Sequence, residues 1–255
     1  MSSEDILSQS PPPADARISY GSDPNQFGDL RVPNGRGPHP LALVIHGGFW
    51  RAKYDLGHAG HMCAALARAG IATLNVEFRR VGNAGGGWPG SFRDIQAAYG
   101  CLPTLAKQYP VDATRVTVVG HSAGGHLALM SAVHQPSLRG VLALAPVSDL
   151  RKAWELHLSN DAVVEFLGET PSHVPDRYAE ASPAELSIRS PQVIIHGTHD
   201  DTVPVEMSRS YVEAKRKRKE NVRLIEPDCG HFELIDPSSS SWPAVQQAAL
   251  ELLKP

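Results

Sequence analysis

A serine flanked by glycines follows an apolar run in the middle of the chain. The segment reads Gly120-His121-Ser122-Ala123-Gly124 and leads into the helical pattern Leu127 to Met130. Glycines two residues either side of the serine leave room for a tight turn from strand to helix, so that the serine side chain projects outward. A serine hydroxyl is a good nucleophile only when a base takes its proton and another group orients that base. The spacing predicts Ser122 as a nucleophile that needs two partners.

A histidine and several acids stand later in the chain, where such partners are needed. His231 comes a few residues after the last apolar run that we expect to be a strand. Asp200 and Asp201 come after the expected strand before that one. Sites in open α/β sheets form at the carboxyl ends of the strands, so these loops are expected to lie near Ser122. Either of the two aspartates is placed to orient His231, and Asp149 is the runner-up acid. The order is therefore nucleophile, acid, base.

Backbone N–H groups must also be available to bind the oxyanion of a tetrahedral intermediate. Ala123 follows the nucleophile at the start of a helix, where free amides and the positive end of the dipole point toward the site. The run from His46 to Trp50 reads H-G-G-F-W and follows an apolar segment directly. Its glycines let the backbone approach a substrate closely. We expect this loop to supply the remaining donors.

Short apolar runs alternate with helical patterns along the chain. Nearly continuous apolar runs are typical of parallel strands covered on both faces, and the alternation predicts an α/β fold with right-handed crossovers. Residues 146–190 interrupt this alternation of apolar runs and helical patterns. We expect them to form a small, partly helical cap insertion. The expected strands are 41–45, 71–76, 115–119, 141–145, 192–195 and 222–225, and the expected helices lie near 57–69, 92–108, 123–135, 205–219 and 243–253.

Composition narrows the class of protein further. The chain has 255 residues, 24 basic and 27 acidic, giving a net charge of −3, so no overall field favours nucleic acid or an anionic membrane. Three widely spaced cysteines favour a reducing, cytoplasmic compartment. No stretch approaches a membrane span, and no motif calls for a metal or another cofactor. We expect residues 1–16 to form a flexible polar leader and 17–255 a single domain.

These motifs together resemble those of the α/β-hydrolase superfamily. The chain is similar to small bacterial esterases and lipase-like enzymes with an H-G-G-x-W loop, which border the arylformamidase and prolyl-oligopeptidase-like groups. The resemblance covers about residues 40–253 and implies a mostly parallel central sheet flanked by helices. It implies Asp200 rather than Asp201 as the acid, because the family's acid stands three residues before Val203. It also implies Gly48 and Phe49 as oxyanion donors beside Ala123.

The function that follows is that of a serine hydrolase acting on a small-molecule ester or amide. We expect a carboxylesterase for small to medium acyl esters, with Ser122, Asp200 and His231 as its triad. Phe49 stands where many esterases of this superfamily have a third glycine, which resembles the formamidase pattern and leaves an arylformamidase as the alternative. A peptidase-like amidase and a non-catalytic ligand-binding module are further alternatives, and monomer and dimer stay open. Three aromatic residues are expected to line the substrate pocket: Trp50, Trp88 and Phe232.

Overall fold

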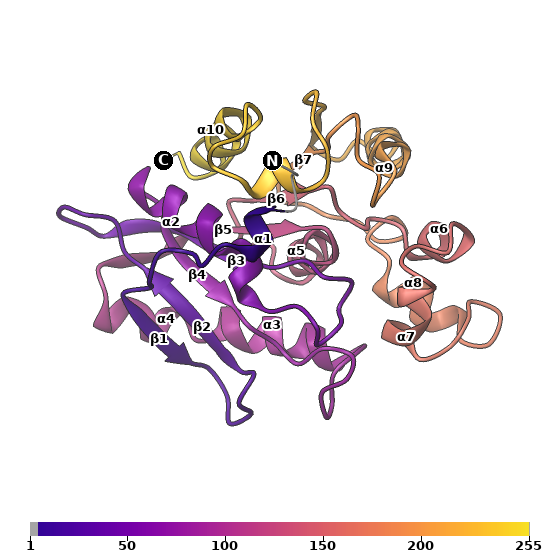
Figure 1. Ribbon diagram of the computed structural model, residues 1–255, viewed down its shortest axis with the longest axis horizontal. Helices are drawn as coiled ribbons and strands as arrows, with labels where there is room; N and C mark the ends of the chain where they lie inside the picture. Colours follow the sequence, from indigo (N-terminus) through magenta and orange to yellow (C-terminus); the bar gives the residue numbers. More distant parts are fainter. Residues whose placement is uncertain (1–4, 255) are drawn as a thin grey trace.

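The computed structural model describes residues 5–254 and is built around one eight-stranded sheet (Figure 1). The strand order is β1-β2-β4-β3-β5-β6-β7-β8. From β4 to β8 every neighbouring pair is parallel, whereas β2 is antiparallel to both β1 and β4. The mostly parallel sheet is therefore confirmed. The strands are β1 (Ala16–Ser19), β2 (Phe27–Arg31), β3 (His39–Ile45), β4 (Ala72–Val76), β5 (Val111–His121), β6 (Gly140–Leu144), β7 (Gln192–Ile195) and β8 (Val222–Ile225).

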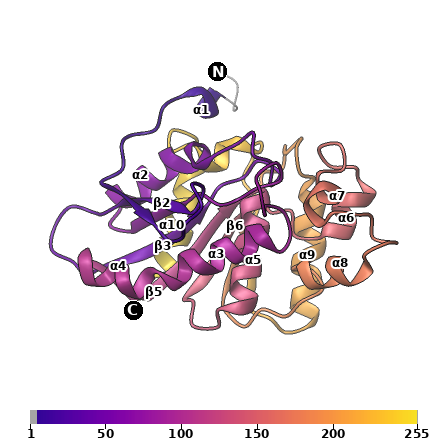
Figure 2. The ribbon, with the colours of Figure 1, turned by 90° about the horizontal axis from the view of Figure 1, so that it is seen from below.

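The central strands are apolar throughout because both of their faces are covered. In β3, Leu41, Leu43 and Ile45 belong to one hydrophobic core cluster, and Ala42 and Val44 to a second one. This alternation follows from the two-residue period of a strand. One cluster takes in α3 and α5, and the other takes in α2 and α10 (Figure 2). A sheet buried in this way places the carboxyl ends of its parallel strands along one edge, where the loops can carry a site.

The helices largely follow the expected positions. Two expected helices are each divided: 57–69 becomes η1 and α2, and 92–108 becomes α3 and α4. The bounds are α1 (Asp5–Ser8), η1 (Leu56–Ala59), α2 (Gly60–Arg68), α3 (Gly90–Gly100), α4 (Leu102–Gln108), α5 (Ala123–His134), α6 (Leu150–Glu155), α7 (Ala162–Leu167), α8 (Pro175–Ala181), α9 (Val205–Lys217), η2 (Phe232–Ile235) and α10 (Trp242–Leu252).

The N-terminal part of the chain is more structured than its sequence indicates. Residues 5–8 form the short helix α1, and Ile6 is buried in the second core cluster. Strands β1 and β2 had no counterpart among the expected elements, because they lie at the antiparallel edge and lack continuous apolar runs. The expectation of a flexible leader is thus wrong for Ile6 and its helix. Residues 1–4 of that leader lie outside the described residues.

The expected cap insertion contains three short helices. Helices α6, α7 and α8 lie together beside α5 and α9 in both ribbon views (Figures 1 and 2). Val163, Phe166 and Tyr178 of the cap are buried in the same core cluster as the central strands. The cap therefore has no separate core of its own within the described residues. It packs onto the core of the main domain.

Candidate active site

Ser122 occupies the tight turn between β5 and α5. Its backbone is at φ 57° and ψ −121°, a strained conformation for a residue with a side chain. A Cβ atom at Gly120 would collide with the backbone of Gly124, and one at Gly124 with the backbone of Ile45. The Ser122 amide donates to the Leu144 carbonyl oxygen at 2.8 Å. The turn is thus held in a shape that the two glycines make possible.

His231 and Asp200 meet beside this turn. The Nδ1 atom of His231 donates to Asp200 Oδ2 at 2.6 Å, and both side chains are at most 2% exposed. The other carboxylate oxygen of Asp200 accepts from the amides of Thr202 at 2.9 Å and Val203 at 2.7 Å. Burial by itself raises the pKa of Asp200, but the hydrogen bonds from His196 and His231 outweigh it and hold the pKa well below its usual range. The carboxylate is therefore ionised and fixed against the imidazole.

The other two acidic candidates are engaged elsewhere. Asp201 is exposed, and its carboxylate accepts from the Thr202 hydroxyl at 3.1 Å. Asp149 caps the N-terminus of α6 by accepting from the Lys152 amide at 3.0 Å. The structure brings Asp200, of the three acids, into contact with His231.

Two further histidines connect the loops around the site. His121 Nε2 lies 3.0 Å from the His231 carbonyl oxygen and so carries the donated proton. Its Nδ1 atom must then accept, and His58 Nε2 donates to it at 2.8 Å. Burial is the main cause that lowers the pKa of His58 to about 3 and the pKa of His121 well below its ordinary value. The first two members of this histidine chain, His58-His121-His231, are neutral. The chain joins η1, the turn at Ser122 and the loop of His231.

The loop after β3 has an unusual backbone. Gly48, Phe49 and Trp50 have φ values of 105°, 48° and 58°, so three successive residues are left-handed and two of them carry side chains. A Cβ at Gly48 would press into the Tyr54 side chain. Among residues 5–254, the amides of Gly48 and Phe49 have no hydrogen-bond acceptor. These amides are available to a ligand beside Ser122.

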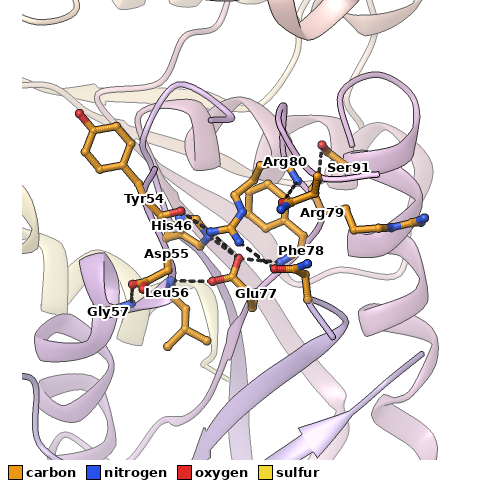
Figure 3. A network of polar contacts seen from close by, with 12 residues as sticks. His46, Tyr54, Asp55, Leu56, Gly57, Glu77, Phe78, Arg79, Arg80 and Ser91 are labelled. Carbon is orange, nitrogen blue, oxygen red and sulfur yellow. Dashed lines mark hydrogen bonds and ion pairs between the residues drawn. The ribbon is translucent and has the colours of Figure 1, made fainter. Parts of the chain in front are cut away.

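A buried carboxylate contacts the residues that precede and follow this loop (Figure 3). Glu77 Oε1 accepts from His46 Nε2 at 3.2 Å and the Phe78 amide at 2.9 Å, and it pairs with Arg80 at 3.0 Å. Glu77 Oε2 accepts from the Leu56 amide at 3.0 Å. Burial raises the pKa of Glu77, but these donors prevail and lower it. These contacts connect the segment after β4 to both ends of the loop.

The cap holds the same loop from the other side. Arg51 donates to both carboxylate oxygens of Glu165, at 2.7 and 3.0 Å, and to the Ser159 hydroxyl at 2.9 Å. Trp50 stacks on Phe166 with ring centroids 4.5 Å apart. The loop is therefore clamped between the sheet and the cap.

Two of the three expected pocket aromatics have structural positions instead. Trp50 is 1% exposed, and its indole N–H donates to His126 Nδ1 at 3.2 Å. Trp88 stacks on Phe92 at 5.5 Å, and its amide donates to the Phe166 carbonyl oxygen at 2.8 Å. The expectation that they line the pocket is wrong because packing against the cap uses their surfaces. Phe232 does line the cavity at Ser122.

The cavity at Ser122 has a volume of about 290 Å³. That volume lies at the lower end of the range of roughly 300–1,000 Å³ for small-molecule sites. Sequence patterns did not predict Leu7, Tyr54, His58, Ser159 or Thr202 as lining residues, since no motif assigns any of them a place in the pocket. The lining consists of Leu7, Gly48, Phe49, Tyr54, His58, Ser122, Ser159, Thr202, His231 and Phe232.

Two further properties concern the described residues as a whole. Between residues 5 and 254, no three His, Cys, Asp or Glu side chains are grouped so as to hold a metal ion. Over the same range, no helix has the length and apolar character needed to cross a membrane.

Known proteins similar to this chain are esterases in most cases. Esterase LipC of Mycobacterium tuberculosis is 28% identical over 92% of this chain and 64% of its own length. The probable carboxylic ester hydrolase LipM of the same organism is 25% identical over 80% of this chain and 52% of its own. The chain thus spans about half to two thirds of the length of these relatives.

Solved structures show the same fold. A truncated carbohydrate esterase from gut microbiota superposes with a TM-score of 0.82 at 20% identity, covering 96% of this chain and 99% of that one. Esterase B from Lactobacillus rhamnosis superposes with a TM-score of 0.81 at 19% identity, covering 98% and 90%. The BD-FAE family matches residues 29–214, which include Ser122 and Asp200. The chain therefore has the α/β-hydrolase fold and belongs to the BD-FAE family.

Proposed function

We propose that this chain is a serine carboxylesterase that cleaves small to medium acyl esters through an acyl-enzyme intermediate. The observation that carries the proposal is the 2.6 Å hydrogen bond from His231 Nδ1 to Asp200, next to the strained turn at Ser122. Ser122 and His231 line one cavity with Gly48 and Phe49. The esterase names of its relatives LipC and LipM support the same reaction.

The first half of the reaction acylates the enzyme. His231 Nε2 takes the hydroxyl proton while Ser122 Oγ forms a bond to the ester carbonyl carbon. The carbonyl electron pair moves to oxygen, and the amides of Gly48, Phe49 and Ala123 bind the resulting oxyanion. The carbonyl then re-forms, the bond to the alcohol oxygen breaks, and His231 gives its proton to that oxygen. Asp200 fixes the tautomer and stabilises the imidazolium.

The second half releases the acid and restores the enzyme. His231 Nε2 takes a proton from water, whose oxygen attacks the acyl carbon. The same amides bind the second oxyanion. When the intermediate collapses, the bond to Ser122 Oγ breaks and this oxygen receives the proton held by His231. The products are one carboxylic acid and one alcohol, and every proton is accounted for.

Hydrolysis of p-nitrophenyl acetate tests the proposal. The Ser122→Ala variant should keep its fold and lose turnover by about 10⁴-fold or more, since the nucleophile is gone. Ser240→Ala, at an exposed serine, is the matched control and should keep the wild-type rate. Substantial hydrolysis by Ser122→Ala would contradict the assignment of the nucleophile.

An N-formyl aryl amide is the second substrate class. Phe49 favours it, because this aromatic residue replaces the third glycine of other oxyanion loops and lines the cavity. The ratio of kcat/KM for an aryl formamide to that for an acetate ester separates the two classes. A ratio above one would make the chain an arylformamidase-type hydrolase with the same triad.

The substrate panel should also contain acetylated sugars. One structural neighbour is described as a carbohydrate esterase and another as an acetyl ester-xyloside bifunctional hydrolase. An aminoacyl amide tests the peptidase-like alternative, which a relative described as a dipeptidyl aminopeptidase from Pseudoxanthomonas mexicana makes relevant. Cytoplasmic localisation stays a prediction from cysteine usage.

A further inference from the structure

An apolar side chain from the N-terminal helix lies at the catalytic cavity. Leu7 of α1 lines the same cavity as Ser122 and His231, although more than a hundred residues separate it from either. Leu7, at 36%, and Leu156, at 41%, are the large hydrophobic side chains exposed among residues 5–254. Exposing apolar surface to water costs free energy. An exposed leucine at the cavity therefore suggests that a bound group covers its side chain.

The segment that carries Leu7 is anchored to the body of the protein. Ile6 is 7% exposed and packs in the second core cluster, while α1 packs against η1. The Gln9 carbonyl oxygen accepts from His61 Nε2 at 3.3 Å, and the Pro12 carbonyl oxygen accepts from Arg31 at 2.6 Å. We call residues 5–13 the N-terminal arm. Its neighbour contacts fix the arm and leave Leu7 directed to the cavity.

The cavity lining combines apolar and polar side chains. Leu7, Phe49 and Phe232 provide apolar surface, and Ser159 and Thr202 provide hydroxyl groups. A substrate group that covers the apolar residues gains free energy in proportion to the surface removed from water. With about 290 Å³ available, such a group must be small, for example a short alkyl chain or one aromatic ring.

We propose that the N-terminal arm is part of the substrate site and that Leu7 is a specificity-determining residue. Together with Phe49 and Phe232, Leu7 contacts an apolar group of the ester. This inference rests on the proposed esterase function and adds the chemical character of the substrate beyond the scissile bond. The apolar group belongs to the acyl part or to the alcohol part, and two substrate series distinguish them.

Steady-state kinetics of Leu7→Ser test the inference. One series varies the acyl chain from acetate to hexanoate on p-nitrophenol, and the other varies the alcohol from methyl to phenyl on acetate. In the series whose variable group contacts Leu7, kcat/KM for the largest ester should fall about three- to ten-fold, mainly through a higher KM. For the smallest ester of that series, kcat/KM should change less than two-fold. We expect a smaller loss than for a residue in an enclosed pocket, because Leu7 stays partly open to water. Leu7→Met should retain the wild-type preference.

The matched control is Leu156→Ser, which changes a similarly exposed leucine on the cap that does not line the cavity. It should leave both series unchanged. Equal effects of Leu7→Ser on small and large esters in both series, or the same loss in Leu156→Ser, would overturn the role of Leu7. Failure of the wild-type chain on every ester would instead contradict the proposed function, and this inference with it.

Discussion

The two halves of the proposed site are held in different ways. On the acid–base side, Asp200 takes hydrogen bonds from the amides of Thr202 and Val203, two and three residues away, and one from His231. On the oxyanion side, the loop at Phe49 and Trp50 depends on groups distant in sequence. They include Glu77 below the loop and Glu165 and Phe166 in the cap.

The difference shows what each half needs from the rest of the molecule. A loop in which the carboxylate accepts hydrogen bonds from neighbouring amides keeps its conformation through its own contacts. Two successive non-glycine residues at positive φ store strain that their own sequence does not relieve, so packing from other segments must hold them. We therefore expect changes on the acid–base side to affect chemistry more than stability. Changes on the oxyanion side should affect chemistry and stability together.

Among the residues that support Ser122, Asp200 should produce the largest loss when it is changed to Asn. The amide no longer stabilises the imidazolium and favours the wrong tautomer of His231, so kcat should fall by about 10³- to 10⁴-fold. The control Asp201→Asn changes an exposed neighbour and should alter kcat less than two-fold. Steady-state kinetics of both variants, with circular dichroism for the fold, check this result. A large loss in Asp201→Asn instead would mean that the acid was misassigned.

Glu77→Gln should affect both stability and rate. It leaves Arg80 buried without its ionic partner, which costs about 3 kcal/mol of unfolding free energy. The shifted oxyanion loop should lower kcat about ten- to a hundred-fold. Urea unfolding and kinetics at one pH measure the two effects. If stability falls while kcat stays at the wild-type value, Glu77 does not position the loop for catalysis.

His121→Leu removes the donor to the His231 carbonyl oxygen and should lower kcat about ten-fold with little change in KM. His121→Gln keeps an N–H in a similar place and should recover much of the rate.

Since the pKa values of His58 and His121 are lowered, both are neutral in the working range. Neither of them should therefore contribute an ionisation to the acid limb of kcat/KM. Two ionisations would indicate that the histidine chain itself titrates.

Arg51→Ala should have the smallest effect. Its partner Glu165 is 46% exposed, and pairs of this kind contribute about 1 kcal/mol or less. Because Trp50 and Phe166 still connect the loop to the cap, kcat should fall less than about five-fold. Kinetics compared with Arg209→Ala, another ion-paired surface arginine, measure the effect. A loss as large as that of Glu77→Gln would show that the cap is the main support of the loop.

The same difference explains what could be predicted from sequence. The sheet, the turn at Ser122 and the loops of Asp200 and His231 follow from local patterns of apolar runs, glycines and strand ends. Trp50 and Trp88 were misplaced because their type alone does not tell a pocket wall from a packing surface. Leu7 was not predicted because its role depends on where the arm docks, and that is set by contacts distant in sequence.

Covalent labelling tests the central claim most directly. A fluorophosphonate reacts with a serine whose hydroxyl is activated by a base, and an unactivated serine does not react at a comparable rate. We predict a single adduct per chain, found by peptide mass spectrometry on Ser122, with strongly slowed labelling in Asp200→Asn. An unlabelled chain, or an adduct on another serine, would contradict the account.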